Sequence, residues 1–563
     1  MFHLNAINLT EFDYRTQFSV NNLIALQWTI LNDMTVAEQI AGILSGAGVR
    51  FVFGVPGGPS IPYMEAFRKV GIEFILTSHE SAAGTMASVT GRMTGIPGVC
   101  HGTFGPGAVN LASGAGGALL DRSPVIILTS EIDNNMLGRT VQMNIDHQKL
   151  FQPLTKATFR INPGNAAFIL LKALDICREE YPGPVHIGLP ADIACLEAAE
   201  PGSNTYESEK KNHLNDKGSI NAILENCRKP LLAVGLTSAR YALGDKLSEF
   251  LLHTKIPVVL TPMAKGLLPE DHPCYAGVFF HALSNYLGDI LEDIDLVIGL
   301  GYDPVEYNYE SWMPDVPLID FTTAETDLPA VKHVTRFTGS PGEWFTILEQ
   351  LHMGQLIFNK IKIDSVRNET NAVLYGLTDH FGPVTALRVL RKALPADAIV
   401  TFDVGSHLHL AGQYWDTFGR QNMIMTNGWS GMGFGLPAAL AAGILSPGSV
   451  IVCVTGDGGF LMNAGEIITA RRYNLPIITV VLSDGELNLI KLKQSWQDLP
   501  PYATKLYEDD LFSAEMFLGI RILHADSEES MKSAINMALS MKKPVIINAR
   551  IDPDDYNWLV VRK

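Results

Sequence analysis

Cysteine is scarce in this sequence. Only six cysteines occur among 563 residues, and no two of them have the C-x-x-C spacing that zinc ribbons and thioredoxin-type sites share. Six thiols in a chain of this length do not form a disulfide scaffold, so we expect a reducing, cytoplasmic environment. Residues 1–18 include acids and lack an apolar core of signal-peptide length, which agrees with that expectation.

Basic residues are also in deficit. Lysine and arginine total 42 against 59 aspartates and glutamates, which gives a formal net charge of −17. Nucleic acids and anionic membrane surfaces repel such a chain, so we expect neither as a partner. Charged residues amount to only 18% and hydrophobic residues to 47%, which excludes disorder as the main state and provides material for large buried cores.

One stretch lacks charge altogether. No charged residue occurs between Arg420 and Asp457, and that span is long enough to cross a membrane. Glycines and prolines interrupt it repeatedly from Gly428 to Gly448, and it ends in a strand-like run. Because such residues break a spanning helix, the stretch predicts a buried loop, helix and strand instead.

Short apolar runs alternate with longer amphipathic segments along the chain. In the first third they predict strands at Val52–Val55, Val99–His101, Val125–Leu128 and Val185–Leu189, and helices at Val36–Gly46 and Ser81–Thr94. Strand-like runs return at 231–235, 257–261, 296–299 and 318–321, and again at 399–403, 450–454, 477–482 and 545–550. Such alternation implies parallel sheets covered by helices on both faces. The predicted fold class is α/β, with three doubly wound parallel-sheet domains.

Polar stretches without a clear period separate these thirds. Glu197–Ser219 forms one break and Lys360–Thr378 a weaker one. At roughly 150 residues per domain, the length allows three or four domains. We therefore expect an N-terminal extension at 1–33, a first domain at 34–200, a central domain at 201–370 and a last domain at 371–563.

The strongest chemical signal lies in the last third. One apolar run ends in Gly456-Asp457-Gly458-Gly459, with a helix expected from about Leu461, and the next run ends in Ser483-Asp484-Gly485-Glu486. The two aspartates are 484 − 457 = 27 positions apart. Neighbouring parallel strands end side by side, at the edge where α/β proteins bind ligands. Two carboxylates and a carbonyl there suit Mg²⁺, and glycines before a helix suit a diphosphate. The alternative is two ordinary turns with Asp at strand ends.

A second signal lies in the first third. Glu80 directly follows an apolar run and begins a segment of small residues, ESAAGTMASVTG. By itself this pattern indicates an acid in the first turn of a helix, where the helix dipole favours a negative charge. It gains chemical meaning only in combination with the acid pair of the last third.

Together these motifs resemble those of thiamine diphosphate enzymes. A Gly-Asp-Gly followed at this spacing by Asn or Asp is similar to that family's metal and diphosphate signature, with Ser483-Asp484 in place of the usual Asn pair. FGVPGG and GTFGPGAVN resemble its glycine loops, although Phe104 stands where Ser is usual. DVGSH and NGWSGMGFGLPAA resemble its cofactor-binding loops. The segment Gly301–Trp312 looks close to the FAD-independent, catabolic acetolactate synthases.

The resemblance implies roles for individual residues. Asp457, Asp484 and the backbone carbonyl of Glu486 are the implied Mg²⁺ ligands. Glu80 is implied to share a proton with N1′ of the aminopyrimidine and so to activate the cofactor, and Gln142 is a second implied catalytic residue. Met432 is implied to hold the cofactor in its V shape. The implied cofactor-binding residues are Gly57, Gly58, Glu80, Asn110, Gly405, Ser406, His407, Gly431, Met432, Gly456, Asp457, Gly458, Gly459, Asp484, Glu486, Leu487 and Asn488.

The resemblance also implies an activity. The first domain is expected to bind the pyrimidine and the last to bind the diphosphate of thiamine diphosphate. The reaction is expected to be decarboxylation of a 2-oxo acid, with pyruvate as the expected substrate, followed by carboligation to a second carbonyl. A homodimer or dimer of dimers is implied, in which Glu80 of one subunit reaches cofactor held by another. FAD is not expected, because the strand at Leu231–Val234 is not followed by consecutive glycines.

Other functions remain open on the sequence alone. FAD-free relatives include carboxyethylarginine synthase-like enzymes and 2-hydroxyacyl-CoA lyases, and Phe104 points to an unusual acceptor pocket. A flavin-linked oxidase is a further alternative. A non-catalytic protein of the same fold would be expected to lose Glu80 or one of the two aspartates, but all three are present.

Overall fold

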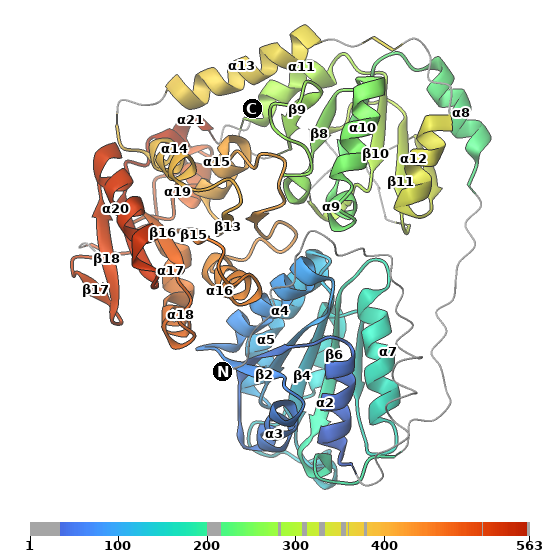
Figure 1. The fold of residues 1–563 in the computed structure, drawn as a ribbon, viewed down its shortest axis with the longest axis vertical. Helices are drawn as coiled ribbons and strands as arrows, with labels where there is room; N and C mark the ends of the chain where they lie inside the picture. Colours follow the sequence, from blue (N-terminus) through green and yellow to red (C-terminus); the bar gives the residue numbers. More distant parts are fainter. Residues whose placement is uncertain are drawn as a thin grey trace. The chain divides into compact units, whose positions relative to one another are not determined.

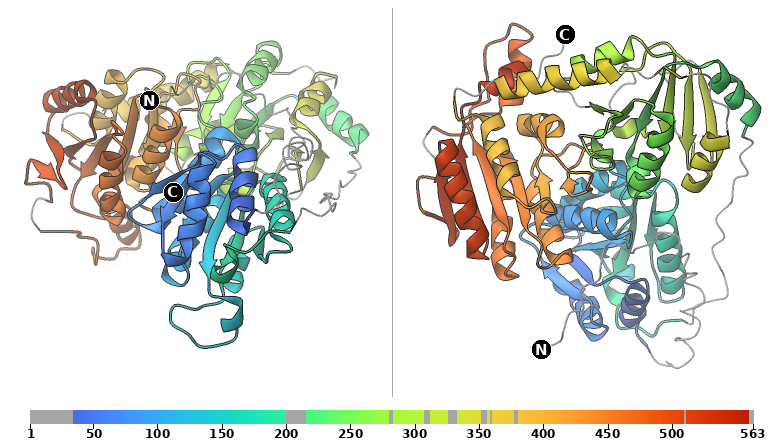
Figure 2. Two further views of the ribbon diagram at one scale, coloured as in Figure 1. Left: turned by 60° about the horizontal axis from the view of Figure 1, so that its bottom comes forward. Right: turned by 45° about the horizontal axis from the view of Figure 1, so that its top comes forward.

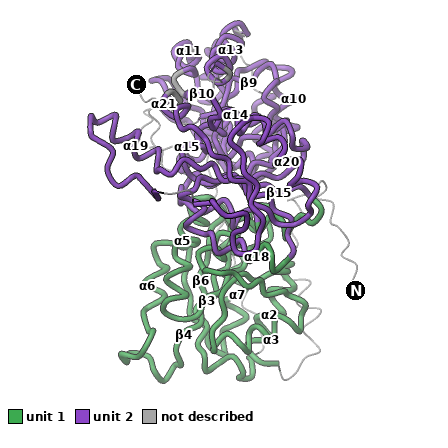
Figure 3. The backbone as a smooth tube through the Cα atoms, turned by 90° about the vertical axis from the view of Figure 1, so that its left-hand side faces the viewer, with its two compact units in different colours: residues 1–209, 440–448, 468–473 green, residues 210–439, 449–467, 474–563 purple. Residues whose placement is uncertain are grey.

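The computed structural model describes residues 34–199, 215–279, 283–306, 312–325, 333–350, 356–357, 360–376, 380–508 and 511–559. These residues form three sheets with flanking helices (Figure 1, with two further views in Figure 2). The chain divides into two compact units, one of residues 1–209, 440–448 and 468–473 and one of the remaining residues (Figure 3). The predicted extension at 1–33 and the break near residue 200 lie outside the described residues.

The first sheet has six parallel strands in the order β2-β1-β3-β4-β6-β5. Its strands are β1 Phe51–Val55, β2 Glu73–Leu76, β3 Gly98–Gly102, β4 Val125–Glu131, β5 Ala157–Arg160 and β6 Pro184–Pro190. Its helices are α2 Val36–Gly46, α3 Ile61–Lys69, α4 Glu80–Thr94, α5 Pro106–Leu120, α6 His147–Phe151 and α7 Ala166–Arg178.

The second sheet also has six parallel strands, in the order β12-β11-β10-β7-β8-β9. The strands are β7 Pro230–Val234, β8 Val258–Leu260, β9 Tyr275–Val278, β10 Leu296–Leu300, β11 Leu318–Thr322 and β12 Val334–Thr338. The helices are α8 Lys217–Asn226, α9 Leu236–Arg240, α10 Gly244–Thr254, α11 Gly288–Leu291, α12 Pro341–Gln350 and α13 Lys360–Gly376. The last of these, the long yellow helix of Figure 2, contacts β9 and α11.

The third sheet has seven strands in the order β14-β13-β15-β16-β19-β18-β17, and only the β17–β18 pair is antiparallel. The strands are β13 Ile399–Phe402, β14 Met423–Ile424, β15 Ile451–Gly456, β16 Ile478–Ser483, β17 Met516–Phe517, β18 Ile520–Ala525 and β19 Val545–Arg550. The helices are α14 Pro383–Ala393, α15 Ser406–Tyr414, α16 Gly435–Leu445, α17 Asp457–Asn463, α18 Ile467–Arg472, α19 Asn488–Ser495, α20 Glu528–Met541 and α21 Asp555–Leu559.

The predicted α/β class with three parallel sheets is confirmed. Strands β4, β6, β7 and β10 are buried along their whole length, as expected when helices cover both faces of a sheet. The uncharged stretch from residue 421 to 456 contains a short strand, the buried helix α16 and strand β15, as predicted. Among the described residues no helix is both long and apolar enough to span a membrane.

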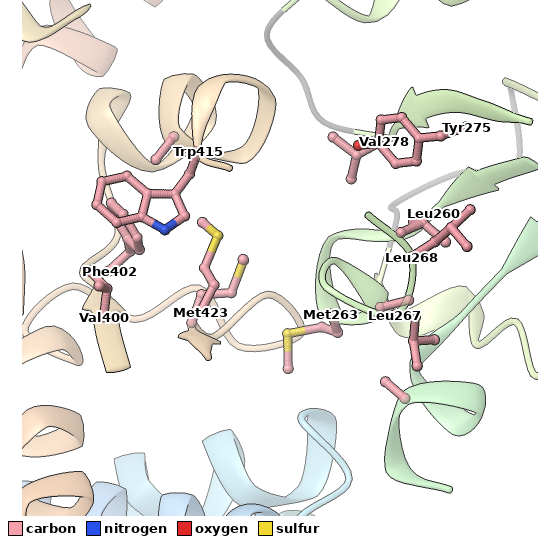
Figure 4. Close-up of a cluster of buried hydrophobic side chains, with 14 of the residues drawn as sticks. Leu260, Met263, Leu267, Leu268, Tyr275, Val278, Val400, Phe402, Trp415 and Met423 are labelled. Carbon is pink, nitrogen blue, oxygen red and sulfur yellow. The ribbon is translucent and has the colours of Figure 1, made fainter. Parts of the chain in front are cut away.

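The second and third sheets share one hydrophobic core. Leu260, Met263 and Val278 from the second sheet region belong to the same cluster as Phe402 and Trp415 from the third, and Figure 4 shows several of these side chains. A single cluster explains why the two sheets fall into one compact unit.

This shared core yields a stability prediction. Leu260 has no exposed surface, so Leu260→Ala should lower the free energy of unfolding by about 2–5 kcal/mol through lost burial and the cavity left behind. Leu252→Ala is the matched control, because Leu252 is 66% exposed and lies in the same unit. Denaturant unfolding of both variants tests the prediction, and equal losses of stability would contradict it.

Candidate functional site

Two aspartates meet at the carboxyl edge of the third sheet. Strand β15 ends at Gly456 and strand β16, parallel to it, ends at Ser483. Asp457 and Asp484 are therefore the first residues beyond two neighbouring strands. Asp457 is 3% exposed, and its carboxylate accepts a hydrogen bond from the Asp484 N–H at 3.2 Å. The predicted juxtaposition of the two loops is present.

The two carboxylate oxygens of Asp457 have different surroundings. Oδ2 accepts hydrogen bonds from the backbone N–H of Gly485 at 2.7 Å and from the Tyr507 hydroxyl at 2.7 Å, in addition to Asp484. Oδ1 accepts a hydrogen bond from the Gly458 N–H at 2.8 Å. Three donors fix Oδ2, so Oδ1 is the oxygen better placed to bind a cation.

The second aspartate has a strongly altered acidity. Burial, followed by repulsion from Asp457, raises the pKa of Asp484 to about 7, although hydrogen bonds from the Glu486 N–H and the Asn488 side chain work in the opposite direction. Burial and the same two acids raise the pKa of the Tyr556 phenol well above its ordinary value. Asp457 is buried and Asp484 is half-buried, so their negative charges repel one another unless a cation binds both. Oxygen donors of this kind suit Mg²⁺.

Glycines around this acid pair bring predicted residues into contact. A Cβ on Gly458 would lie 3.0 Å from Leu487 Cδ2 and 3.2 Å from Met432 Cε. A Cβ on Gly459 would lie 2.8 Å from a carboxylate oxygen of Asp403. The first turn of α17 therefore has room for backbone only, and side chains from other segments pack directly against it.

The loop after β13 completes one side of this site. The His407 ring packs on two glycines, since its Cε1 would lie 2.8 Å from a Cβ on Gly405 and 3.5 Å from one on Gly456. Ser406 Oγ and His407 Nε2 are buried and have no hydrogen-bond partner among the described residues. Buried polar atoms without partners are unusual in folded proteins and fit a site that takes a polar ligand. These residues therefore fit the diphosphate end of a bound cofactor.

Asp403 organises the glycine loop that carries Gly431 and Met432. Its carboxylate accepts hydrogen bonds from Gly433 N–H at 2.9 Å, Gly435 N–H at 3.3 Å and the Thr455 hydroxyl at 3.2 Å. Burial raises the pKa of Asp403 to about 6 in spite of these donors. Asp403 thus fixes the loop that presents Met432 to Gly458.

A return segment, residues 496–508, folds back onto the acid loop. It pairs with that loop through an antiparallel bridge between Glu486 and Lys505, and through a hydrogen bond from Leu487 N–H to the Thr504 carbonyl at 2.8 Å. The carboxylate of Glu486 pairs with Lys491, which is compatible with the backbone role predicted for Glu486. The return segment is also what delivers Tyr507 to Asp457.

In the first unit, two helices of small residues bring Glu80 and Asn110 together. A Cβ on Gly84 of α4 would lie 2.8 Å from the Cα of Gly114 on α5, so the helices cross in close contact. Glu80 begins α4 and is 8% exposed. Its carboxylate accepts a hydrogen bond from the Asn110 side chain at 3.0 Å, and a Cβ on Gly107 would lie 3.2 Å from its other oxygen.

The remaining predicted residues of the first unit lie around this pair in different ways. Gly57 packs on Thr103, because a Cβ on it would lie 2.4 Å from Thr103 Oγ1, whereas a Cβ on Gly58 would meet open space. Gln142 is exposed, and no contact among the described residues brings it to Glu80. A shallow pocket lies between Asn110 and residues 143–145. The catalytic role of Gln142 stays a prediction.

The carboxyl edge of the second sheet, where a nucleotide would bind in many α/β proteins, is filled by the chain itself. The carboxyl group of Glu306 accepts hydrogen bonds from the N–H of Leu236, the first residue of α9, at 2.7 Å and from Met263 N–H at 3.1 Å. Gly235 packs on Gly301 and Tyr302, which would lie 2.5 Å from its Cβ. Burial raises the pKa of Glu306 to about 8.

Sequence reasoning missed some of these features. The helix expected from about Leu461 begins at Asp457, because Gly458 and Gly459 are needed for close packing and do not interrupt the helix. Tyr507 lies 50 positions after Asp457 in a segment without periodicity, so no local motif could have identified it. Asp403 was signalled only by its place in the DVGSH loop.

Three family models match the chain. Residues 34–150 match the thiamine pyrophosphate enzyme N-terminal TPP binding domain, residues 219–343 its central domain and residues 403–549 its C-terminal TPP binding domain. Glu80 and Asn110 lie within the first match, and Asp457 and Asp484 lie within the last.

Curated relatives match over nearly the whole chain. The large subunit of acetolactate synthase isozyme 2 from Escherichia coli is 29% identical over 544 residues, covering 94% of this chain and 97% of that protein. A probable acetolactate synthase large subunit from Methanocaldococcus jannaschii is 29% identical, covering 92% of each chain. Acetolactate synthase from Bacillus subtilis is 27% identical, covering 92% of this chain and 93% of that protein.

The hydroxyl of Tyr507 provides a test of the acid pair. Tyr507→Phe removes one donor to Asp457 Oδ2, and loss of such an orienting partner should weaken Mg²⁺ binding by about tenfold. Tyr502→Phe makes the same change at a side chain that is 81% exposed in the same segment. Calorimetric titration of Mg²⁺ in the presence of thiamine diphosphate measures both affinities, and an unchanged affinity in Tyr507→Phe would contradict the role.

Glu306 predicts a pH dependence of stability. Because its pKa is raised from 4.5 to about 8, the folded protein retains a proton that the unfolded chain releases between these values. The contribution of Glu306 to stability is therefore largest at low pH and is lost as the pH rises toward 8.

Glu306→Gln removes this titration. The free energy of unfolding of the variant relative to wild type should rise with pH between 5 and 8, by up to about 1.4 kcal/mol per pH unit. Glu249→Gln, at an exposed position of α10, is the control and should show no such trend. Denaturant unfolding at several pH values measures the difference, and parallel profiles for Glu306→Gln and wild type would show that the group does not titrate in this range.

Proposed function

The chain belongs to the thiamine pyrophosphate enzymes, and from that premise we propose that it is a thiamine diphosphate-dependent carboligase of the acetolactate synthase type. It decarboxylates a 2-oxo acid, for which we propose pyruvate, and joins the remaining fragment to a second carbonyl. The observation that carries the proposal is the acid pair at the ends of β15 and β16, of which Asp457 is buried, with glycines packed around it. The acetolactate synthase relatives, similar over nearly their whole length, favour this activity over the other FAD-free lyases.

The residues of the second unit fit the diphosphate end of the cofactor. We assign the side chains of Asp457 and Asp484 and the backbone carbonyl of Glu486 to a Mg²⁺ ion. Gly456, Gly458 and Gly459 have no side chains, so the backbone at the start of α17 can approach phosphate oxygens closely. The loop of Gly405, Ser406 and His407 lies beside these glycines and carries two buried polar atoms, Ser406 Oγ and His407 Nε2, without a partner among the described residues. The side chain of Asn488 hydrogen-bonds Asp484. Met432, with Gly431 beside it, and Leu487 provide apolar support at Gly458.

The residues of the first unit fit proton transfer. When bound, thiamine diphosphate supplies the carbon nucleophile and accepts the electron pair released as CO₂ leaves. Glu80 holds a proton at its carboxyl oxygen for exchange with a ring nitrogen of the aminopyrimidine. The side-chain amide of Asn110 donates a hydrogen bond to Oε2 of Glu80 and fixes the orientation of the carboxyl group. Burial of Glu80 keeps water from competing for the proton.

Assembly with further copies of the chain is part of the proposal. Exposed apolar side chains adjoin both groups of site residues: Val109, Met143 and Ile145 near Asn110, and Leu461 and Met462 on α17. Surfaces of this kind are costly in water and favour burial against another subunit. We propose a homodimer or dimer of dimers in which each cofactor contacts Glu80 and the acid pair.

A flavin is not part of the proposed enzyme. The carboxyl group of Glu306 accepts a hydrogen bond from the first backbone N–H of α9, so it would compete with a phosphate group for that N–H.

We also propose a cytoplasmic location. The cysteines at 100, 177, 227, 274 and 453 are buried, Cys195 is exposed, and all six are free thiols, a state that a reducing compartment preserves.

Product analysis tests the proposal. Purified protein incubated with pyruvate, thiamine diphosphate and Mg²⁺ should form 2-acetolactate, detected as acetoin after acid treatment. Glu80→Gln should bind the cofactor about as well as wild type but slow exchange of the thiazolium C2 proton by orders of magnitude, because a carboxyl that shares a proton is replaced by an amide that does not. Glu73→Gln, an exposed acid of the same unit, is the control.

The outcomes separate the parts of the proposal. Release of CO₂ without a ligated product would favour a decarboxylase or another acceptor. Absence of cofactor uptake would overturn the assignment of the acid pair. Wild-type exchange in Glu80→Gln would remove Glu80 from the reaction.

A further inference from the structure

The first unit contains a second cluster of buried, chemically active side chains. Glu131, His147 and His186 are 7%, 2% and 0% exposed. Their candidate ligand atoms lie within 4.8 Å of one another. Two histidines and a carboxylate are a set that binds transition metals. The cluster lies outside the acid pair and has no part in the reaction as described.

Hydrogen bonds argue against a metal in this cluster. Both nitrogens of His186 have partners, Thr129 Oγ1 at 2.7 Å and Thr158 Oγ1 at 2.7 Å. The Glu131 carboxylate pairs with the Arg160 guanidinium at 2.5 Å and accepts a bond from the Gln148 side chain at 2.6 Å. A cation would have to displace these bonds beside an arginine charge. The cluster is therefore an internal hydrogen-bond network.

The position of the proton on His147 follows from one backbone donor. Gly105 N–H donates to His147 Nε2 at 3.2 Å, so neutral His147 carries its proton on Nδ1. That proton is donated to Thr129 Oγ1 at 2.9 Å. With the His147 proton on Nδ1, the hydroxyl hydrogen of Thr129 is available to His186 Nε2, an arrangement that places the proton of His186 on Nδ1, toward Thr158. If the His147–Thr129 bond were reversed, the proton of His147 would lie on Nε2 and face the N–H of Gly105.

Burial keeps both imidazoles neutral, as this order requires. It lowers the pKa of His147 to about 4, against a smaller opposing effect of Asp146. Burial, with His147 as a second cause, lowers the pKa of His186 well below its ordinary value. The relay, defined as Gly105, His147, Thr129, His186 and Thr158, therefore contains two neutral imidazoles at neutral pH.

The relay ends at the loop that contacts Glu80. Gly105 is buried, has a φ of +67°, and has no space for a side chain, because a Cβ would lie 2.4 Å from the Met143 carbonyl. It precedes α5, and its carbonyl accepts the N–H of Val109 at 3.0 Å. Two residues later, Gly107 packs on the Glu80 carboxylate. One turn later, Asn110 donates to it.

We propose that His147 is a positioning residue, held in the required tautomer by Thr129 and His186, which fixes the start of α5 and through it the Glu80–Asn110 pair. This inference rests on the proposed function of Glu80. His147 is the only link between the relay and the loop that the described hydrogen bonds show. If His147 carried its proton on Nε2 instead, the N–H of Gly105 would be buried without an acceptor and the loop would shift.

Substitutions at Thr129 test the relay without changing any charge. Thr129→Val keeps the shape of the side chain but cannot accept from His147 or donate to His186. Thr129→Ser restores the hydroxyl. Thr90→Val is the matched control, because Thr90 is 8% exposed on the helix that carries Glu80 and its hydroxyl bonds only the Met86 carbonyl in the contacts described. Thr158→Val interrupts the relay at His186 Nδ1, and it replaces Thr129→Val as the test variant if Thr129→Val does not fold.

The first measurement uses the full-length protein without cofactor. Amide hydrogen exchange is measured by mass spectrometry of a peptide that covers residues 102–111 and so contains the amide of Gly105. In Thr129→Val this exchange should be faster by about tenfold or more, the factor expected when a buried N–H loses its acceptor. Thr129→Ser and Thr90→Val should resemble wild type.

The second measurement is exchange of the thiazolium C2 proton in protein loaded with thiamine diphosphate and Mg²⁺. It should slow by about tenfold or more in Thr129→Val with the cofactor affinity unchanged, because the residues assigned to the diphosphate lie elsewhere. Unchanged amide exchange and unchanged C2 exchange in Thr129→Val would overturn the relay. Equal effects in Thr129→Val and Thr90→Val would also overturn it, since they would reflect general destabilisation. Absence of C2 exchange in wild type would instead count against the proposed function.

Discussion

The repulsion between the carboxylates of Asp457 and Asp484 is the constraint on which the site depends. Asp457 and Asp484 follow neighbouring parallel strands, so the geometry of the sheet forces them together whatever their charges. Two negative charges close together away from water are unfavourable, and burial followed by repulsion from Asp457 raises the pKa of Asp484 accordingly. A divalent cation reverses the balance, because each carboxylate then faces a larger opposite charge. The same repulsion that disfavours the empty pair makes the pair selective for a cation.

The surroundings of the pair are built to preserve this arrangement. Main-chain N–H groups and a phenol hold one oxygen of Asp457 and leave the other less engaged. Glycines at the start of α17 allow Met432 and Leu487 to approach the backbone. In the first unit, small residues play the same part for Glu80, since close crossing of α4 and α5 places Asn110 beside it. Both groups of residues are rigid because backbone, not long side chains, sets their positions.

The sequence was sufficient to predict the parts of this arrangement that are local in the chain. Buried central strands are continuous apolar runs, and the residues directly after them, such as Asp457 and Asp484, are fixed by strand ends. Edge strands such as β14 and β17 are only two residues long and lack such runs, so they were not predicted. Contacts between distant segments were out of reach for a different reason. Tyr507, Glu306 and the Thr129–His186 relay each join residues that no shared period or motif connects, and only tertiary packing brings them together.

The continuous core of the second and third sheets has a consequence for how the chain can be rearranged. Side chains from both sheets fill one cluster, with Trp415 and Leu260 among its members. Cutting the polypeptide between these parts, or grafting the middle segment from a distant homologue into a chimaera, would leave unmatched apolar faces on both pieces. Recombination that respects sequence boundaries alone would thus produce insoluble hybrids, whereas an exchange that moved both sheets together would keep their common interior intact.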